Sequence, residues 1–325
     1  MDALVRLLQL LVLLLTLPLH IMALLGFWEP LCKSYFPYLM AVLAAKTNRK
    51  MEGKKRELFS QIKGLAGASG KVALLELGCG TGANFQFYPS GCRITCLDPN
   101  PNFEKFLTKS MAENRHLEYE RFVVAFGEDM KQLADGSMDV VVCTLVLCSV
   151  QSPRKVLQEV HRVLRPVLRL PVCLPSVTLS FWPPFENVSP VVPTQSREAR
   201  HTRSGRAAGA GAQEASRSRT GLLPELEDQH LPLHREGGLF FFWEHVAEPR
   251  GSWAFLWQQV AEPTWKHIGD GCRLTRETWK DLESAQFSEL QMERQPPPFK
   301  WLPVGPHIMG KAVKKAFPKS CLRSE

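Results

Sequence analysis

Short apolar runs alternate with helical patterns through the middle of the chain. The segment VALLEL (Val72–Leu77) is almost continuously apolar, which is typical of a parallel strand that is buried on both faces. Helical stretches separate most of the strand-like runs that follow, at Arg93–Asp98, Arg121–Phe126, Met138–Leu147 and Gly238–His245. One of these stretches, Ser152–Leu164, carries its apolar residues at helical spacing. This order predicts a βαβ series and therefore an α/β fold.

Towards the C-terminus the pattern predicts one more helix and two strands. LTRETWKDLESAQF has helical spacing, with Thr275 as its expected cap, and FSELQMERQ and HIMGKAVKK are expected to form a closing strand pair. Trp253, Trp257 and Trp265 precede them, either in plain core packing or on a segment that covers an acceptor site.

The helix Ser152–Leu164 is followed by a proline but not by the glycine turn that should lead into the next strand. The expected glycines appear only at Gly237 and Gly238, after residues 167–236. This insert holds eight arginines, eight prolines and no lysine, and it shows no sustained period. We expect it to be disordered and looped out of the fold. It is interpreted as a product of splicing or of the gene model, with a regulatory arginine-rich segment as the alternative.

The N-terminal 45 residues are strongly apolar, which predicts a membrane anchor. Pro18, Pro30 and Pro37 leave open whether the anchor is a spanning helix or a hairpin that enters and leaves one face. A cleaved signal peptide is disfavoured, because no cleavage site of small residues stands out. Basic residues cluster directly after the anchor, between Lys46 and Arg56, which places the following domain in the cytosol.

Composition excludes several other functions. The net charge of +8 is moderate. The sequence shows no basic face with interleaved aromatics, the feature that would predict nucleic-acid binding. Nine cysteines without a CxxC pair indicate neither a zinc site nor a disulfide framework, so we expect reduced thiols and no metal.

The candidate chemistry lies at the end of the first strand, in the sequence ELGCGTGANF. Gly78, Gly80 and Gly82 form a tight turn that allows a ligand to approach the backbone, and a helix is expected to follow. The spacing differs from that of dinucleotide folds. Asp98 ends the second strand, where a carboxylate can accept both hydroxyls of a ribose. These features favour an adenosine ligand without a pyrophosphate over a purely structural turn with a capping aspartate.

This set of motifs resembles the seven-stranded S-adenosylmethionine-dependent methyltransferases. The resemblance implies a Rossmann-like class I fold, with S-adenosyl-L-methionine held by the glycine turn and its ribose by Asp98. Glu76 matches the acid that orients the loop. Where the family carries an acidic residue near the adenine, this chain has AFGED (Ala125–Asp129), which leaves Gly127 and Glu128 as weak candidates for the adenine contact.

A closer resemblance, to the methyltransferase-like 7 family, covers most of the chain outside the insert. It is carried by LCKSYFPYLMAVL, NRKMEGKKRELFSQIKG, LELGCGTGANFQFYP, VVVCTLVLCSV and WEHVAEP. The family comprises small thiol S-methyltransferases of the endoplasmic reticulum membrane and lipid droplets. The resemblance therefore implies methyl transfer to small alkyl thiols or hydrogen sulfide at the cytosolic face of those membranes.

The expected organisation follows from these patterns. It comprises a hydrophobic anchor (1–45), a basic linker and helix (46–70), a methyltransferase domain in two parts (71–166 and 237–314), the insert (167–236) and a tail (315–325).

The acceptor is less clearly indicated than the cofactor. The run TLVLCSV after the fourth strand is apolar and lacks the motif of enzymes that methylate base amino groups. We therefore expect an apolar acceptor pocket, in which a thiol reacts as its thiolate. If a general base exists, His245 is the weak candidate, whereas Cys148 is expected to be an inert core residue. A lipid or quinone O-methyltransferase and a non-catalytic lipid-droplet protein remain as alternatives.

Overall fold

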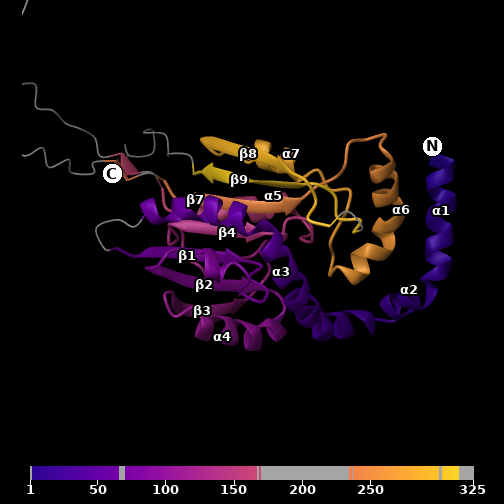
Figure 1. The fold of residues 1–325 in the computed structure, drawn as a ribbon, viewed down its shortest axis with the longest axis horizontal. Coiled ribbons are helices and arrows are strands. Elements are labelled where there is room, and N and C mark those ends of the chain that lie inside the picture. The colour runs from indigo at the N-terminus through magenta and orange to yellow at the C-terminus, as the bar shows by residue number, and fades with distance from the viewer. Residues whose placement is uncertain are drawn as a thin grey trace, which may run out of the picture. The chain divides into compact units, whose positions relative to one another are not determined.

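A seven-stranded sheet is the centre of the computed structural model, which describes residues 2–65, 70–166, 168–169, 234–235, 237–299 and 302–314. Its strands are β1 (Val72–Leu77), β2 (Cys92–Asp98), β3 (Glu118–Val124), β4 (Val140–Thr144), β7 (Leu239–His245), β8 (Glu289–Gln295) and β9 (His307–Val313). They lie in the order β3-β2-β1-β4-β7-β9-β8 (Figure 1). The first five pair in parallel, and β9 pairs antiparallel with both β7 and β8. The seven-stranded α/β fold is confirmed.

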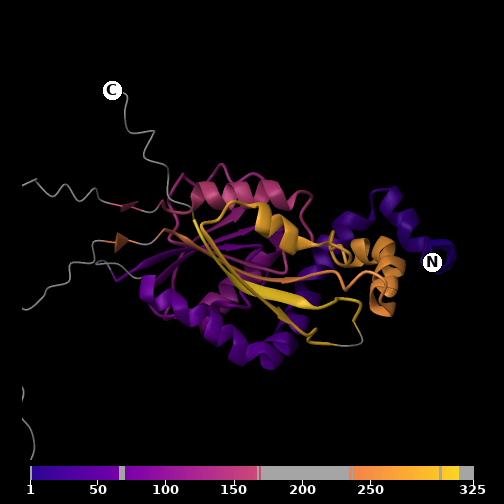
Figure 2. The ribbon, with the colours of Figure 1, turned by 90° about the horizontal axis from the view of Figure 1, so that it is seen from above.

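Helices cover both faces of the sheet (Figure 2). On one face, α5 (Pro153–Val163) and α7 (Thr278–Ser284) pack against Phe240 and Phe242 of β7. On the other face, Phe241 of the same strand packs with Phe59 from the end of α3 (Trp28–Ser60). The 3-10 helix η1 (Gln61–Leu65) and the helix α4 (Glu104–Glu113) complete that second layer. Burial on both faces explains why β1, β4 and β7 are largely apolar rather than alternating.

Three local predictions were wrong. β4 ends at Thr144 instead of reaching Leu147, because Leu145 has a φ of 59° and leaves the extended conformation. The glycine turn leads only into the 3-10 helix η2 (Phe85–Phe87), not into a regular helix. Thr275 does not cap α7, since its hydroxyl donates to the Glu262 carboxylate and Glu277 occupies the cap position.

Two short helices, α1 (Asp2–Leu15) and α2 (Leu17–Leu24), precede the domain. Val5 of α1 packs against Leu256 and Val260 of α6 (Trp253–Ile268), which lies beside α1 in Figure 1. Among the described residues, no single helix is long and apolar enough to cross a membrane. Residues 3–15 and 17–24 meet that criterion only as a pair, which is bent by 76°.

The second apolar run, Tyr35–Ala45, belongs to the 33-residue helix α3, which contains Pro37 in its interior. The same helix continues through the basic segment as far as Ser60. This run and the basic residues after it therefore form one continuous element that reaches from the N-terminal helices to the core of the domain.

The strand after the insert pairs in the sheet as predicted, because β7 lies between β4 and β9. The insert departs at the amino end of β7, where the Gly238 N–H donates to the Arg165 carbonyl at 2.9 Å. Its two ends pair briefly as β5 (Leu168–Arg169) and β6 (His234–Arg235). The residues that connect β5 to β6 lie outside the described residues, and so does the tail from residue 315. The prediction that the insert is disordered falls on residues of the first group.

Candidate functional site

A cavity of about 540 Å³ opens at the carboxyl ends of the parallel strands. This is the edge at which open α/β sheets bind their ligands. One wall is formed by the loops after β1, β2, β4 and β7, and the facing wall by apolar side chains of α3, namely Phe36, Leu39, Met40 and Leu43. The second apolar run of the sequence thus lines the site, a role that its composition alone did not indicate.

The glycine turn is held against the second strand by its own backbone. The N–H groups of Gly78 and Cys79 both donate to the Leu97 carbonyl, at 2.7 and 3.1 Å. Gly78 has a φ of +61°, and a Cβ on it would lie 2.2 Å from a methyl group of Val146. Gly78 and Gly80 line the cavity, whereas Gly82 is absent from its lining and packs against Phe85.

Asp98 lies beside this turn with its carboxylate almost fully buried. One of its oxygens accepts the Gly80 N–H at 3.1 Å and the other accepts the Asn100 N–H at 2.9 Å. Burial raises the pKa of Asp98 to about 6. Each oxygen of this fixed carboxylate retains acceptor capacity, and Asp98 lines the cavity, so a pair of ribose hydroxyls can be accepted there.

Glu76 organises a buried polar network below the turn. Its carboxylate accepts hydrogen bonds from Asn84 Nδ2 at 2.7 Å and from the Tyr88 hydroxyl at 2.5 Å. Lys55 Nζ donates to the Oδ1 atoms of Asn48 and Asn84, at 2.8 Å each. Burial raises the pKa of Glu76 to about 7 and lowers that of Lys55 to about 8.

Sequence reasoning missed Lys55 and Asn84. Lys55 was counted with the basic residues of the membrane flank, but it is buried at the site and ties α3 to the glycine loop. Its position in the helix was the available signal, because it falls near the apolar residues Leu58, Phe59 and Ile62 that face the core.

Gly127 and Glu128, the two weak candidates for the adenine contact, both line the cavity. Glu128 Oε1 accepts the backbone N–H groups of Gln151 and Ser152, at 2.7 and 3.2 Å, and thereby holds the loop that precedes α5. A ligand that contacts this oxygen therefore shares it with the two backbone N–H groups of the loop.

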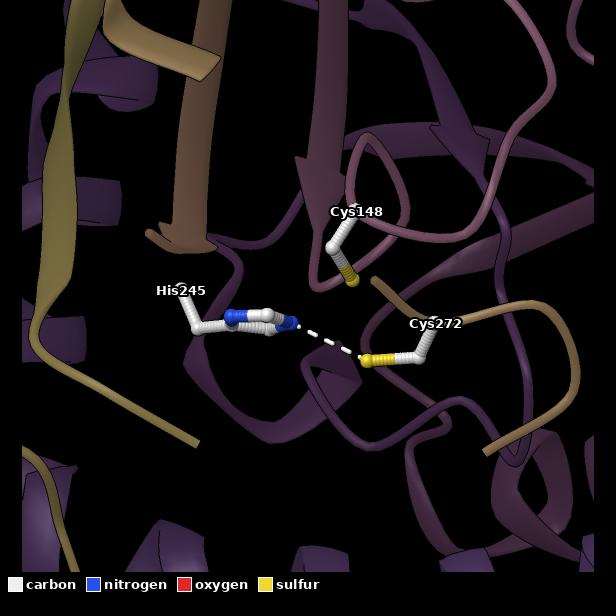
Figure 3. Close-up of side chains that lie close together, drawn as sticks. All are labelled: Cys148, His245 and Cys272. Atoms are coloured by element: carbon white, nitrogen blue, oxygen red, sulfur yellow. Dashed lines mark hydrogen bonds between the residues drawn. The ribbon is translucent and has the colours of Figure 1, made fainter. Parts of the chain in front are cut away.

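His245, the weak candidate for a general base, lies at the end of β7 and also lines the cavity. Its Nε2 is 3.0 Å from Cys272 Sγ, and Cys148 Sγ completes a group whose three donor atoms lie within 4.8 Å of one another (Figure 3). All three residues are buried. Trp265, also in the lining, donates its indole N–H to Cys272 Sγ at 3.2 Å, whereas Trp253 and Trp257 are exposed.

No sequence pattern connects these three residues. They come from the loop after β4, the end of β7 and the loop after α6, so no short spacing signals them.

Comparisons with known proteins agree with this geometry. Residues 75–167 match the model of a methyltransferase domain. The chain is 69% identical over 314 residues to human "Thiol S-methyltransferase TMT1B", covering 97% of this chain and 100% of that protein. It is 45% identical to human "Thiol S-methyltransferase TMT1A", covering 89% of this chain and 90% of that protein. The chain belongs to the family of these methyltransferases.

A crystal structure of a SAM-dependent methyltransferase from Thermotoga maritima is similar in fold. It is 12% identical, covers 86% of this chain and 99% of that chain, and has a TM-score of 0.41.

The cofactor of this methyltransferase is S-adenosylmethionine, and the residues of the cavity fit it. Asp98 offers a buried, fixed acceptor for the ribose, and Gly80 beside it has a φ of +50°, a backbone conformation that favours glycine. The cofactor supplies an electrophilic methyl group on a sulfonium. Holding it against the β1 and β2 loops leaves the apolar α3 wall and the loops after β4 and β7 for the acceptor.

Proposed function

We propose that this methyltransferase transfers the methyl group of S-adenosylmethionine to the sulfur of small alkyl thiols or of hydrogen sulfide. The observation that carries the proposal is the match to two thiol S-methyltransferases along nearly the whole of both relatives. The apolar α3 wall of the cavity supports it, since small alkyl thiols are themselves apolar.

The chain contributes alignment and exclusion of water. Asp98 and the glycine turn fix the donor, while Phe36, Leu39 and Met40 hold a small apolar acceptor against it. The acceptor releases its proton to solvent before transfer, because the thiolate is the nucleophile. The new carbon–sulfur bond forms with the thiolate electron pair, and the pair of the broken bond stays on the sulfur of the departing S-adenosylhomocysteine.

A panel of acceptors tests this assignment. Purified full-length protein is incubated with S-adenosylmethionine and either small thiols, hydrogen sulfide, or the matching alcohols and a quinol. Methylated product and S-adenosylhomocysteine are then measured by mass spectrometry. We expect product from the small thiols and hydrogen sulfide only. Methylation of the hydroxyl acceptors alone would assign an O-methyltransferase, and cofactor binding without turnover of any acceptor would favour a non-catalytic protein.

We further propose that the protein works on the cytosolic face of the endoplasmic reticulum membrane or of lipid droplets. The apolar side chains of α1, α2 and α6 support this proposal, because many of them face solvent. Leu15 is 74% exposed, Leu24 86% and Trp253 73%, and Phe27, directly before α3, is 65% exposed. An apolar surface of this extent, with tryptophan among its residues, is typical of contact with a lipid interface.

Flotation with liposomes of neutral lipids tests the membrane proposal. Replacing Leu15, Leu24 and Phe27 together by serine should move the protein from the lipid to the soluble fraction, since the contact is apolar. Recovery of this triple variant with the liposomes at the wild-type level would contradict it. Binding that is lost at high salt in the wild-type protein would instead indicate an electrostatic contact.

A further inference from the structure

Two thiols and an imidazole converge on one wall of the cavity. Cys148 follows β4, His245 ends β7 and Cys272 follows α6, and Figure 3 shows their side chains pointing toward one another. The sulfur and nitrogen donors all lie within 4.8 Å of one another. Donors bonded to one tetrahedral zinc ion at about 2.0–2.3 Å are roughly 3.3–3.8 Å apart. The 3.0 Å between His245 Nε2 and Cys272 Sγ lies slightly below this range and no distance within the group exceeds 4.8 Å, so small shifts place the three around a common ion.

Backbone and side-chain contacts fix the two loops that carry the cysteines. The Arg273 N–H donates to the Cys148 carbonyl at 3.0 Å. Arg276 Nη1 donates to the carbonyls of Leu147 and Val150, at 2.6 and 2.7 Å. Gly271, at a φ of +87°, approaches so closely that a Cβ on it would lie 2.9 Å from the Ser149 carbonyl oxygen. The two thiols are therefore presented by loops that are tied together, as a metal site requires.

The surroundings of Cys272 Sγ suit a thiolate ligand. An indole N–H is a donor only, so the 3.2 Å contact from Trp265 makes Cys272 Sγ an acceptor. Hydrogen bonds of this kind to metal-bound sulfur stabilise the ligand and set its orientation. An imidazole–thiol pair that acts alone as a base needs only one cysteine, and it does not account for Cys148 at the same point.

We propose that Cys148, His245 and Cys272 bind a zinc ion whose fourth position faces the cavity. Three protein ligands with one open position are the arrangement of catalytic rather than structural zinc. Zinc also suits a set of two thiolates and one imidazole, whereas harder cations prefer oxygen ligands.

The role of the fourth position rests on the proposed function. The substrate thiol would bind there as its thiolate and release its proton to solvent, because metal ligation favours the deprotonated sulfur. Its free electron pair then forms the bond to the methyl carbon, and the bond from that carbon to the sulfonium sulfur breaks. Nothing is oxidised or reduced. The product is a neutral thioether, a weak ligand that leaves the zinc.

Metal analysis of the purified full-length protein tests the site independently of activity. We expect about one zinc ion per chain in the wild-type protein by inductively coupled plasma mass spectrometry. Cys148→Ser and Cys272→Ser should each lose at least nine-tenths of it. Cys92→Ser is the matched control, because this thiol is also fully buried but lies at the start of β2, outside the cluster. Wild-type zinc content in both cluster variants would overturn the site.

Cobalt substitution of the wild-type protein covers the case in which a serine variant fails to fold. Co²⁺ in this site should give sulfur-to-cobalt charge-transfer absorption, and a small thiol should increase it. The metal site is overturned if the wild-type protein shows no such absorption with Co²⁺ and still methylates thiols without zinc. That result leaves the proposed function intact and assigns the cluster to metal-free proton transfer. Zinc at the cluster without methylation of any thiol supports the site and contradicts the proposed function.

Discussion

Replacing Asp98 by asparagine should weaken S-adenosylmethionine binding without unfolding the protein. Both carboxylate oxygens accept a backbone N–H, from Gly80 and Asn100, and the residue lines the cavity. An asparagine keeps the shape but replaces one acceptor oxygen by an NH₂ group. At least one ribose hydroxyl then loses its acceptor, and the remaining bond is no longer to a charged group.

The size of the effect follows from the loss of charge. A hydrogen bond to an ionised group contributes about 1.5–3 kcal/mol. Since each 1.4 kcal/mol is about tenfold in affinity, the Kd for the cofactor should rise between roughly 10-fold and 150-fold.

The pH dependence of binding gives a second, independent signature. Burial raises the pKa of Asp98 to about 6 in the free protein. A bound ribose favours the charged carboxylate. Cofactor affinity should therefore be highest above this pKa, where the carboxylate is ionised, and should fall as the pH drops through it. Glu76, with a pKa raised to about 7, lines the same cavity, and the comparison must therefore be between the wild-type and Asp98→Asn profiles.

Isothermal calorimetry between pH 5 and 8, from about one unit below this pKa to about two units above it, measures both quantities. The matched control is Asp135→Asn, the same change at a side chain that is 80% exposed on the surface. Thermal unfolding without cofactor shows whether each variant is folded. Wild-type affinity in a folded Asp98→Asn variant, or the same loss of binding at low pH in both proteins, would refute the assignment of Asp98 to the ribose.

Three further perturbations follow from the structure. Lys55→Met should lower the free energy of unfolding, measured by urea denaturation, by about 1–3 kcal/mol, because it leaves two buried amide oxygens without a donor. The control Lys54→Met, at an exposed side chain, should change it by less than about 0.5 kcal/mol. Deleting residues 1–27 should reduce binding to liposomes yet preserve cofactor affinity within about threefold, since the cavity lining begins in α3; a tenfold loss would place α1 or α2 in the site. Replacing residues 167–236 by a direct peptide bond should stabilise the domain by roughly 2–3 kcal/mol in thermal unfolding with unchanged cofactor affinity, and a less stable product would show that the insert belongs to the fold.

Local patterns in the sequence determined the sheet and half of the site. Strands buried on both faces need continuous apolar runs, so β1, β4 and β7 were visible without a structure. The glycine turn and Asp98 were visible for a related reason. In a parallel sheet the carboxyl ends of neighbouring strands meet at one edge, so motifs that end consecutive strands must come together.

Only the tertiary structure decided the other half. Phe36 and Leu39 belong to an apolar run that predicts a membrane anchor. Their place in the cavity wall depends on where α3 packs, which no local sequence pattern indicates. Lys55 belongs to a basic cluster that predicts a membrane flank. It is buried because the amide oxygen of Asn84, after the glycine turn, accepts a hydrogen bond from it. Cys148, His245 and Cys272 are separated by up to 124 positions in the chain, and their meeting is set by the strand order and the loop after α6. Sequence periodicity reports which face of an element is apolar, whereas the contacts between elements arise only when those faces pack together.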